Sequence, residues 1–306
     1  MEPLRFKKRY ITCEQGVFDL LLQSQKPLSA AEVARELGTS EDGMERLLDA
    51  LVGVEVLEVE LTQGTAYYSS TDVANLYLAK NSAKSLYDMI IYQSQTIYPL
   101  WNNLGDAVRE GKNQNEKTFD YDSLSQEEML KFMGLMNSSW VIDGHDVVNA
   151  FDLSRFKSIV DVGGCSGALA RELAKAYPAS TLTVLDLPEV IQTAQKHFSQ
   201  SDDTIKFLEG DFFKEDLPAA DLYVLARIIH DWKEEKSLTL LRKIHAACNS
   251  GGGVLLVELF SLNMLVQTEG KEQPPSHYTR LLTAAGFTDV GVCRTGKSYD
   301  TILALK

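Results

Sequence analysis

The segment Asp161-Val-Gly163-Gly164-Cys165-Ser-Gly167 is the most informative part of this chain for its fold class. It follows the apolar run 158–162 and precedes a segment, 168–176, with the spacing of a helix, so it joins a strand to a helix. Glycines allow the backbone to turn tightly and to approach a ligand, and the N-terminus of the helix offers free N–H groups. The stretch therefore predicts a ligand-binding loop in an α/β sheet.

The same stretch argues against a dinucleotide-binding loop. That fingerprint needs glycines at positions 163, 165 and 168, whereas the chain has Cys165 and Ala168. The loop also begins with an acid, Asp161, which suits a cationic or amine-bearing ligand. A glycine-rich loop alone can be a mere tight turn. On the ligand-binding reading, the expected cofactor contacts in the loop are Asp161, Gly163, Gly164 and Gly167.

Strand and helix patterns alternate on both sides of this loop. The predicted strands are rich in Val, Ile and Leu, as in a parallel sheet covered on both faces. They are Ser158–Val162, Thr181–Leu185, Ile205–Leu208, Leu222–Leu225 and Val254–Val257, and the helices between them include Ala168–Ala176 and Leu238–Cys248. The chain ends in a hairpin, Asp289–Arg294 and Tyr299–Leu305, whose last strand must run antiparallel. This pattern predicts the Rossmann-like methyltransferase variant of the doubly wound α/β fold.

Acidic residues stand at the ends of three successive predicted strands. Asp186 follows the second strand, where a ribose-binding carboxylate falls in nucleotide-binding sheets, although it could also be a turn residue before Pro188. Gly210, Asp211 and Phe212 follow the third strand. Because parallel strands end at one edge of a sheet, we expect these side chains to converge with Asp161 on one crevice.

A histidine follows the fourth strand on the same edge. His230 lies in the segment Arg227-Ile-Ile-His230-Asp231 and can accept the proton of a phenol-type hydroxyl near neutral pH. A lone histidine is more often structural than catalytic. His230 differs from the other histidines because it lies just past a strand end, on the edge of the sheet where ligands bind. No His, Cys and Asp cluster has the spacing of metal ligands, so we expect no metal.

Residues 10–118 have a different, mostly helical pattern. A capping box at Ser29–Glu32 opens a helix that ends at Gly38, and a second helix and an alternating β-ribbon around Gly64 follow. This order predicts a winged-helix module. The second helix is acidic, which argues against nucleic-acid binding and favours dimerisation. We expect a helical winged-helix dimerisation domain at 1–118 and a catalytic domain at 119–306. A helical stretch over Leu86–Val108 predicts a buried aromatic face.

Composition narrows the partners and the compartment. The net charge of −13 argues against nucleic acids and anionic membrane surfaces as partners. No apolar run is long enough to span a membrane, and the N-terminus lacks the pattern of a secretory signal. The four cysteines form no CxxC pair. They could form two disulfides, but a chain of 306 residues does not need disulfides for stability. We therefore expect a cytoplasmic protein.

Several of these residues belong to motifs that resemble those of a known family. The motifs Gly210-Asp-Phe-Phe-Lys214, His230-Asp-Trp232 and Ser261-Leu-Asn263-Met-Leu-Val-Gln267 resemble those of small-molecule O-methyltransferases, and most closely the vertebrate hydroxyindole O-methyltransferases. The resemblance runs from about Cys13 to Lys306. It implies an S-adenosylmethionine-dependent enzyme, a homodimer through the N-terminal domain, and a small aromatic hydroxyl substrate. The expected reaction is methylation of N-acetylserotonin to melatonin, with no metal.

The resemblance also implies roles for individual residues. His230 is the expected general base, and Glu258 and Glu272 are the carboxylates that flank it. The implied cofactor contacts are Asp186, Gly210, Asp211, Phe212 and Arg227, and Trp140 lines the cofactor pocket. The implied substrate contacts are Asp231, Asn263 and Gln267.

Two departures from the family pattern keep an alternative open. Cys165 stands where the hormone-making members usually carry glycine, and the segments near 119–121 and 259–260 are shorter than in the family. The short segments are either natural deletions or joins across missing loops. The alternative function is a catalytically inactive dimeric relative that binds only the cofactor or a partner.

Overall fold

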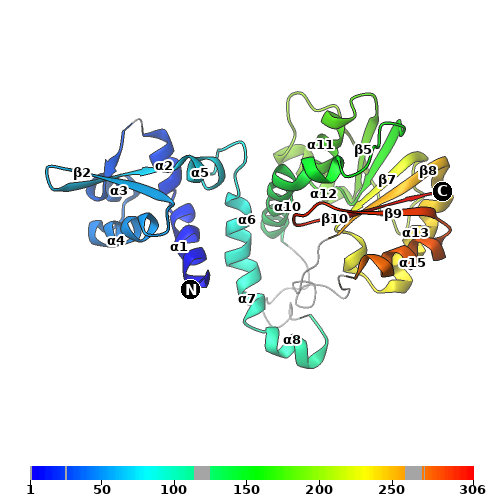
Figure 1. Cartoon of the computed structure of the whole chain (residues 1–306), viewed down its shortest axis with the longest axis horizontal. Coiled ribbons are helices and arrows are strands. Elements are labelled where there is room, and N and C mark those ends of the chain that lie inside the picture. The colour runs from blue at the N-terminus through cyan, green and yellow to red at the C-terminus, as the bar shows by residue number, and fades with distance from the viewer. Residues whose placement is uncertain (1, 25, 114–124, 259–270, 272) are drawn as a thin grey trace. The chain divides into compact units, whose positions relative to one another are not determined.

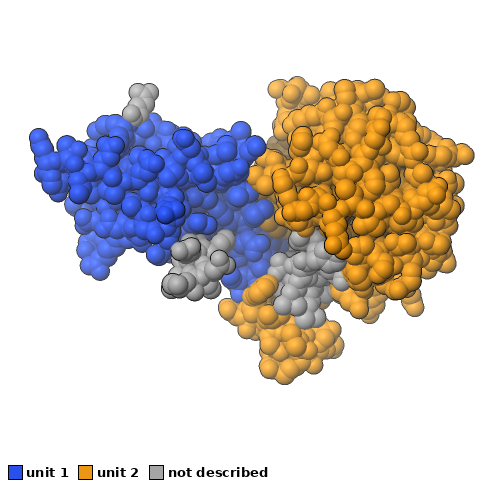
Figure 2. Space-filling view, in the orientation of Figure 1, with its two compact units in different colours: residues 1–98 blue, residues 99–306 orange. Residues whose placement is uncertain are grey.

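The computed structural model describes residues 2–24, 26–113, 125–258, 271 and 273–306. Contacts between residues divide the chain into two units, residues 1–98 and 99–306, which Figure 2 colours separately. The domain boundary expected from the sequence, between residues 118 and 119, lies outside the described residues. Among the described residues, no helix is both long and apolar enough to cross a bilayer.

The first unit begins its helices where the sequence signals place them. Ser29 and Glu32 form the predicted capping box, and Gly38, with φ of 66°, ends the same helix. The helices are α1 (Glu2–Glu14), α2 (Val17–Gln23), α3 (Ala30–Leu37), α4 (Glu41–Val52), α5 (Asp72–Tyr77) and α6 (Tyr87–Tyr92). Buried faces of these helices and of the small sheet form one core, which includes Phe18, Leu48 and Tyr68.

A short antiparallel sheet completes this unit. Its strands are β1 (Leu28–Ser29), β2 (Leu57–Thr62) and β3 (Thr65–Ser70), in the order β1-β3-β2. Gln63 and Gly64 join β2 to β3, and both have positive φ, as a two-residue hairpin turn requires. The predicted order of helix, helix and ribbon is present.

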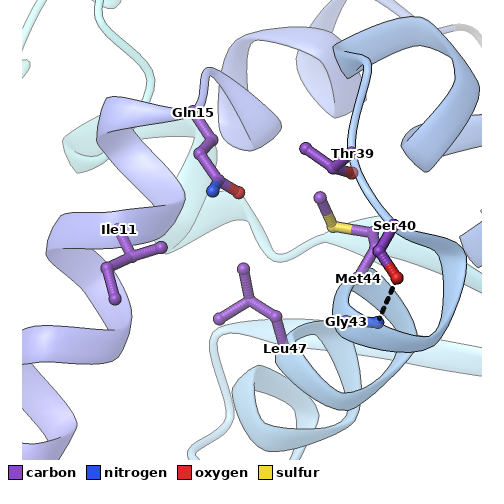
Figure 3. Close-up of a pocket in the computed structure, with 7 residues that line it drawn as sticks. All are labelled: Ile11, Gln15, Thr39, Ser40, Gly43, Met44 and Leu47. Atoms are coloured by element: carbon purple, nitrogen blue, oxygen red, sulfur yellow. Dashed lines mark hydrogen bonds between the residues drawn. The ribbon is translucent and has the colours of Figure 1, made fainter.

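A pocket lies between α1 and α4 in this unit (Figure 3). None of the residues that line it is a predicted site residue. The Ser40 hydroxyl oxygen at its rim accepts the Gly43 N–H and so caps α4. Its lining residues are Ile11, Gln15, Thr39, Ser40, Gly43, Met44 and Leu47.

The helical stretch after residue 86 is less regular than predicted. A π-helical turn, η1 (Gln93–Ile97), separates α6 from α7 (Tyr98–Trp101), and α8 (Leu104–Glu110) follows. Pro99 has no N–H with which to continue the i→i−4 bonding, which accounts for the wider turn before it. The predicted buried aromatic face is wrong for Trp101, which is 40% exposed, whereas Tyr92 is buried.

The second unit is built on a seven-stranded sheet with the strand order β6-β5-β4-β7-β8-β10-β9. The strands are β4 (Ser158–Val162), β5 (Thr181–Asp186), β6 (Lys206–Glu209), β7 (Ala220–Ala226), β8 (Cys248–Glu258), β9 (Thr288–Arg294) and β10 (Asp300–Leu305). The first five strands are parallel to one another, and β10 is antiparallel to both β8 and β9. The predicted methyltransferase sheet with its terminal hairpin is confirmed.

Helices cover both faces of this sheet, as Figure 1 shows. They are α10 (Gln126–Val148), α11 (Ala168–Ala176), α12 (Pro188–His197), α13 (Glu234–Ala247) and α15 (Pro275–Ala285), with a 3-10 turn η2 at Ile229–Asp231. Successive residues of β4 point to opposite faces of the sheet. Ile159 lies in the hydrophobic core that includes residues of α10 and α11, and Val160 lies in the core that includes residues of α13 and α15. This two-sided burial explains why the strands are apolar at nearly every position.

The strand order reverses between β4 and β7. The chain runs outward from β4 through β5 to β6 and then returns to β7 on the other side of β4. In open parallel sheets, ligands bind beyond the carboxyl ends of the strands at such a switch point. The glycine-rich loop follows β4, and Arg227 to His230 follow β7, so the two predicted motifs meet at this position.

Candidate active site

The loop after β4 is packed so tightly that its glycines cannot be replaced without movement. A Cβ atom on Gly163 would lie 2.4 Å from Ile228 Cδ1, and one on Gly164 would lie 2.6 Å from Asp161 Oδ2. Gly163 and Gly167 also have φ of 70° and 78°, which disfavours any residue with a side chain. The contact with Ile228 joins this loop to the segment after β7, across the switch point.

Cys165 completes the loop in a left-handed conformation with φ of 54°, which is uncommon for a residue other than glycine. Its N–H donates to Asp186 Oδ2 at 2.9 Å, and the N–H of Leu187 donates to Asp186 Oδ1 at 2.8 Å. The Asp186 carboxylate is therefore held by one amide from the glycine loop and one from its own turn. Cys165 itself is buried, and burial raises the pKa of its thiol, so it is not a reactive thiolate.

Two carboxyl groups are buried side by side at this edge of the sheet. Burial, with a smaller contribution from the nearby Asp186 carboxylate, raises the pKa of Asp161 to about 7. Burial also raises the pKa of Asp186 to about 6, although its two amide bonds oppose the shift. Asp161 Oδ2 has no hydrogen-bond partner among the described residues. A buried, unpaired carboxylate oxygen fits a ligand that brings a cation or a hydrogen-bond donor.

The turn after β6 adds a hydrophobic wall. Gly210 donates its N–H to the carbonyl oxygen of Asp186 at 2.9 Å, which fixes this turn against the end of β5. The Phe212 ring is buried and contacts the rings of Phe213 and Trp232, with centroids 5.0 and 5.8 Å away. Asp211 accepts the Phe213 N–H and pairs with Lys214, whose hydrogen bond lowers the pKa of Asp211.

Arg227 and Trp140 take up positions that the sequence did not specify. Arg227 has φ of 60°, its Nη1 lies 3.1 Å from the Met136 sulfur, and its Nε is buried without a partner among the described residues. Trp140, on α10, is buried with its ring 4.8 Å from the ring of Tyr299. Both residues therefore lie in the second unit, but Trp140 packs into the core beside Tyr299.

His230 and Glu258 form the most chemically informative contact. Nδ1 of His230 lies 2.8 Å from Oε2 of Glu258, and both side chains are buried. The other carboxylate oxygen accepts the N–H of Ile229 at 3.2 Å, and His230 Nε2 lies 3.5 Å from Asp231 Oδ1. A carboxylate at Nδ1 favours the tautomer whose Nε2 can accept a proton. An imidazole next to a buried carboxylate in this way has the geometry that general-base chemistry at Nε2 requires.

Some predicted residues are not placed. Glu272, Asn263 and Gln267 lie outside the described residues, as do the short segments near 119–121 and 259–260. Among the described residues, no group of His, Cys, Asp and Glu could hold a metal ion.

Sequence reasoning missed a buried cation beneath the glycine loop. Arg171 lies on α11 and donates to the carbonyl oxygen of Ser166 at 2.9 Å. The sequence contained a sign of this burial, because Arg171 lies among the apolar residues Leu169, Ala170 and Leu173 on one short helix.

Comparison with known protein families identifies the class of protein to which this fold and this site belong. Residues 101–288 match the O-methyltransferase domain, and residues 10–80 match the O-methyltransferase dimerisation domain. The chain belongs to the O-methyltransferase family.

Its relatives narrow the family further. The chain is 50% identical to the acetylserotonin O-methyltransferase of Gallus gallus, over 98% of this chain and 93% of the relative. It is 44% identical to the Homo sapiens enzyme of the same name, over 97% of this chain and 93% of the relative. The crystal structure of human N-acetylserotonin methyltransferase in complex with SAM superposes with a TM-score of 0.95 at 43% identity, covering 99% of this chain and 94% of that one.

Proposed function

We propose that this chain transfers a methyl group from S-adenosylmethionine to the hydroxyl of a hydroxyindole, with N-acetylserotonin as the substrate. The observation that carries the proposal is the contact between His230 Nδ1 and Glu258 Oε2 at the switch point of the sheet. The names of the relatives with 50% and 44% identity support the choice of substrate.

The cofactor fits the residues at this edge of the sheet. The unpaired Oδ2 of buried Asp161 suits the α-ammonium group, and the amide-held carboxylate of Asp186 suits the ribose hydroxyls. Phe212 and the Gly210–Asp211 turn suit the adenine ring, and Arg227 offers a buried N–H donor. Trp140 is the proposed lining of the pocket beside Arg227. When bound, S-adenosylmethionine supplies an electrophilic methyl group on a sulfonium.

The protein's own groups prepare the hydroxyl for attack. His230 takes the hydroxyl proton on Nε2, so that the substrate oxygen becomes a better nucleophile. Glu258 then faces the positive charge that develops on the imidazole ring, as the aspartate does in a Ser-His-Asp triad. Glu272 is proposed as the second flanking carboxylate. Asp231, Asn263 and Gln267 are proposed to hold the indole so that the oxygen and the methyl carbon are aligned, since alignment supplies much of the acceleration.

The quaternary structure and the compartment are also proposals. The dimerisation-domain match over residues 10–80 supports a homodimer formed through the first unit. A cytoplasmic location agrees with four free thiols in the described residues.

Cys165 supports one alternative, a dimeric relative that binds the cofactor without turnover. Its side chain adds atoms to a loop that approaches the ligand, at a left-handed position that favours glycine.

The test is incubation of the purified chain with S-adenosylmethionine and a panel of hydroxyindoles and flavonoid phenols, with mass spectrometry of the products. Methylated N-acetylserotonin would support the enzyme. Cofactor binding in a calorimeter with no methylated product would support the alternative instead.

A further inference from the structure

The buried guanidinium of Arg171 has no role in the function proposed above. Arg171 lies on α11, one turn after the glycine loop, and only 6% of its side chain is exposed. Burying an arginine is unfavourable unless its charge and its N–H groups are satisfied. The contacts of this side chain therefore indicate what it is retained for.

The guanidinium joins two segments that are distant in the sequence. Nε and Nη2 donate to the two carboxylate oxygens of Asp203, at 2.6 and 2.9 Å, which is a bidentate ion pair. Nη1 donates to the carbonyl oxygen of Ser166, at 2.9 Å, inside the glycine loop. Asp203 also accepts the Gln200 N–H at 3.0 Å, and the hydrogen bond from Arg171 lowers the pKa of Asp203.

A second contact fastens the loop to the same segment. A Cβ atom on Gly167 would lie 2.8 Å from Ile205 Cδ1 and 3.3 Å from Phe207 Cζ, so the loop backbone rests directly on these side chains. The segment before β6 therefore supports the glycine loop at two points, through Asp203 by way of Arg171 and through Ile205.

The same loop carries the Cys165 N–H, which holds the carboxylate of Asp186, the proposed acceptor for the ribose hydroxyls. Cys165, directly before Ser166, has φ of 54° and donates its N–H to Asp186. This conformation is unfavourable for a non-glycine residue, so surrounding contacts must hold Cys165 there. The bond from Arg171 to the Ser166 carbonyl fixes the peptide unit between Ser166 and Gly167, two units after the one that carries the Cys165 N–H.

We propose that Arg171, paired with Asp203, is a positioning residue for cofactor binding. It holds the Ser166 carbonyl so that the Cys165 amide stays on Asp186 and the glycine loop keeps the shape that the cofactor meets. This inference rests on the proposed function, because it requires that the cofactor bind at this loop. Arg171 acts through the loop and does not itself contact the cofactor.

The test compares three variants of the full chain by titration calorimetry with S-adenosylhomocysteine and with S-adenosylmethionine. Arg171→Met removes all three charged contacts. Arg171→Lys keeps the charge beside Asp203, but one ammonium group cannot reproduce the bidentate pair and the bond to Ser166 together. Lys175→Met is the matched control, since it breaks an exposed ion pair with Glu172 on the same helix.

We expect Arg171→Met to weaken cofactor binding about 10- to 50-fold, and Arg171→Lys to recover part of this loss. Lys175→Met is expected to bind like wild type. The cofactor KM of Arg171→Met should rise by a similar factor, while kcat at saturating cofactor falls less than about threefold, because the base is untouched. Thermal unfolding of each variant measures the purely structural effect.

Equal affinities for Arg171→Met and Lys175→Met would overturn the inference, even if the melting temperature of Arg171→Met fell. If Arg171→Met does not fold, Asp203→Asn and Arg171→Lys replace it, and both must weaken binding at least about threefold. Failure of the wild-type chain to bind either cofactor form would reject the proposed function itself. Binding by wild type with no loss in the variants would reject only the role of Arg171.

Discussion

His230 Nδ1 and Glu258 Oε2 lie 2.8 Å apart, with both side chains buried, although the residues are 28 positions apart in the chain. His230 comes from the 3-10 turn after β7, and Glu258 is the last residue of β8. Because β7 and β8 are parallel neighbours, their carboxyl ends bring the two side chains to one edge. The two adjacent strands thus bring together the side chains of the proposed general base and its carboxylate.

His230→Ala is expected to lower kcat about 10²- to 10⁴-fold, since that is the usual contribution of a positioned base. Cofactor affinity should change little. Steady-state kinetics and calorimetry measure the two effects separately, and His145→Ala, at an exposed position on α10, is the control. Turnover within a few-fold of wild type would remove His230 from the mechanism.

Glu258→Gln should lower kcat about 10- to 10³-fold, because the imidazolium formed during the reaction loses its facing charge. The glutamine still reaches the Ile229 N–H, so the turn should keep its shape. Combining this change with His230→Ala should add almost nothing to the loss, since the two residues act as a unit. Additive losses in the double variant would argue that Glu258 is structural only.

Asp186→Asn should weaken cofactor binding by about 1–3 kcal/mol, because a charged acceptor for the ribose hydroxyls is lost. The kcat at saturating cofactor should be less affected. Glu209→Gln, an exposed carboxylate opposite Asp186 in the strand register, serves as the matched control in calorimetry. Unchanged affinity in Asp186→Asn would place the ribose elsewhere.

Asp161 should make the cofactor-free protein less stable as the pH rises. Its pKa is about 7 in the folded chain and near 3.8 when exposed, so between these values the folded state binds more protons. The contribution of Asp161 to stability is therefore present at low pH and falls by about 1.4 kcal/mol per pH unit through this window. Asp186, whose pKa is about 6, adds a loss of the same sign.

Urea unfolding at pH 5 and pH 7 measures this loss as the difference between wild type and Asp161→Asn. Wild type should lose about 2–3 kcal/mol relative to the variant over these two units. Asp152→Asn is the control, because the pKa of exposed Asp152 is lowered and it titrates below this range. Parallel pH dependences for wild type and Asp161→Asn would contradict the prediction.

The chain should sediment as a dimer at micromolar concentration, with an interface above ~2,000 Å² formed mainly by the first unit. The dimerisation-domain match over residues 10–80 is the basis for this expectation. Analytical ultracentrifugation measures the mass, and raising the salt concentration should not dissociate an interface that is mainly apolar. A monomer under these conditions would count against the assignment.

Regular elements near the glycine loop could be predicted closely, whereas elements with mixed signals could not. β4 and α11 have the predicted bounds, because an apolar run, a glycine loop and a helical spacing follow one another there. β8 begins at Cys248, six residues earlier than expected, since its three consecutive glycines look like a turn. In the sheet they are strand residues: a Cβ on Gly253 would lie 2.4 Å from the Ala304 carbonyl oxygen.

The sequence alone determined the order of strands and helices, the glycine-rich loop, the acids at the strand ends and the histidine after β7. These depend on local periodicity and on the rule that parallel strands end at one edge. Which groups bond to one another near that edge follows from the packing of the chain: the Cys165 amide bonds to Asp186, and Arg171 bonds to both Ser166 and Asp203. Such bonds depend on side-chain directions and on distances of about 3 Å between separate segments, and these are fixed only when the chain packs.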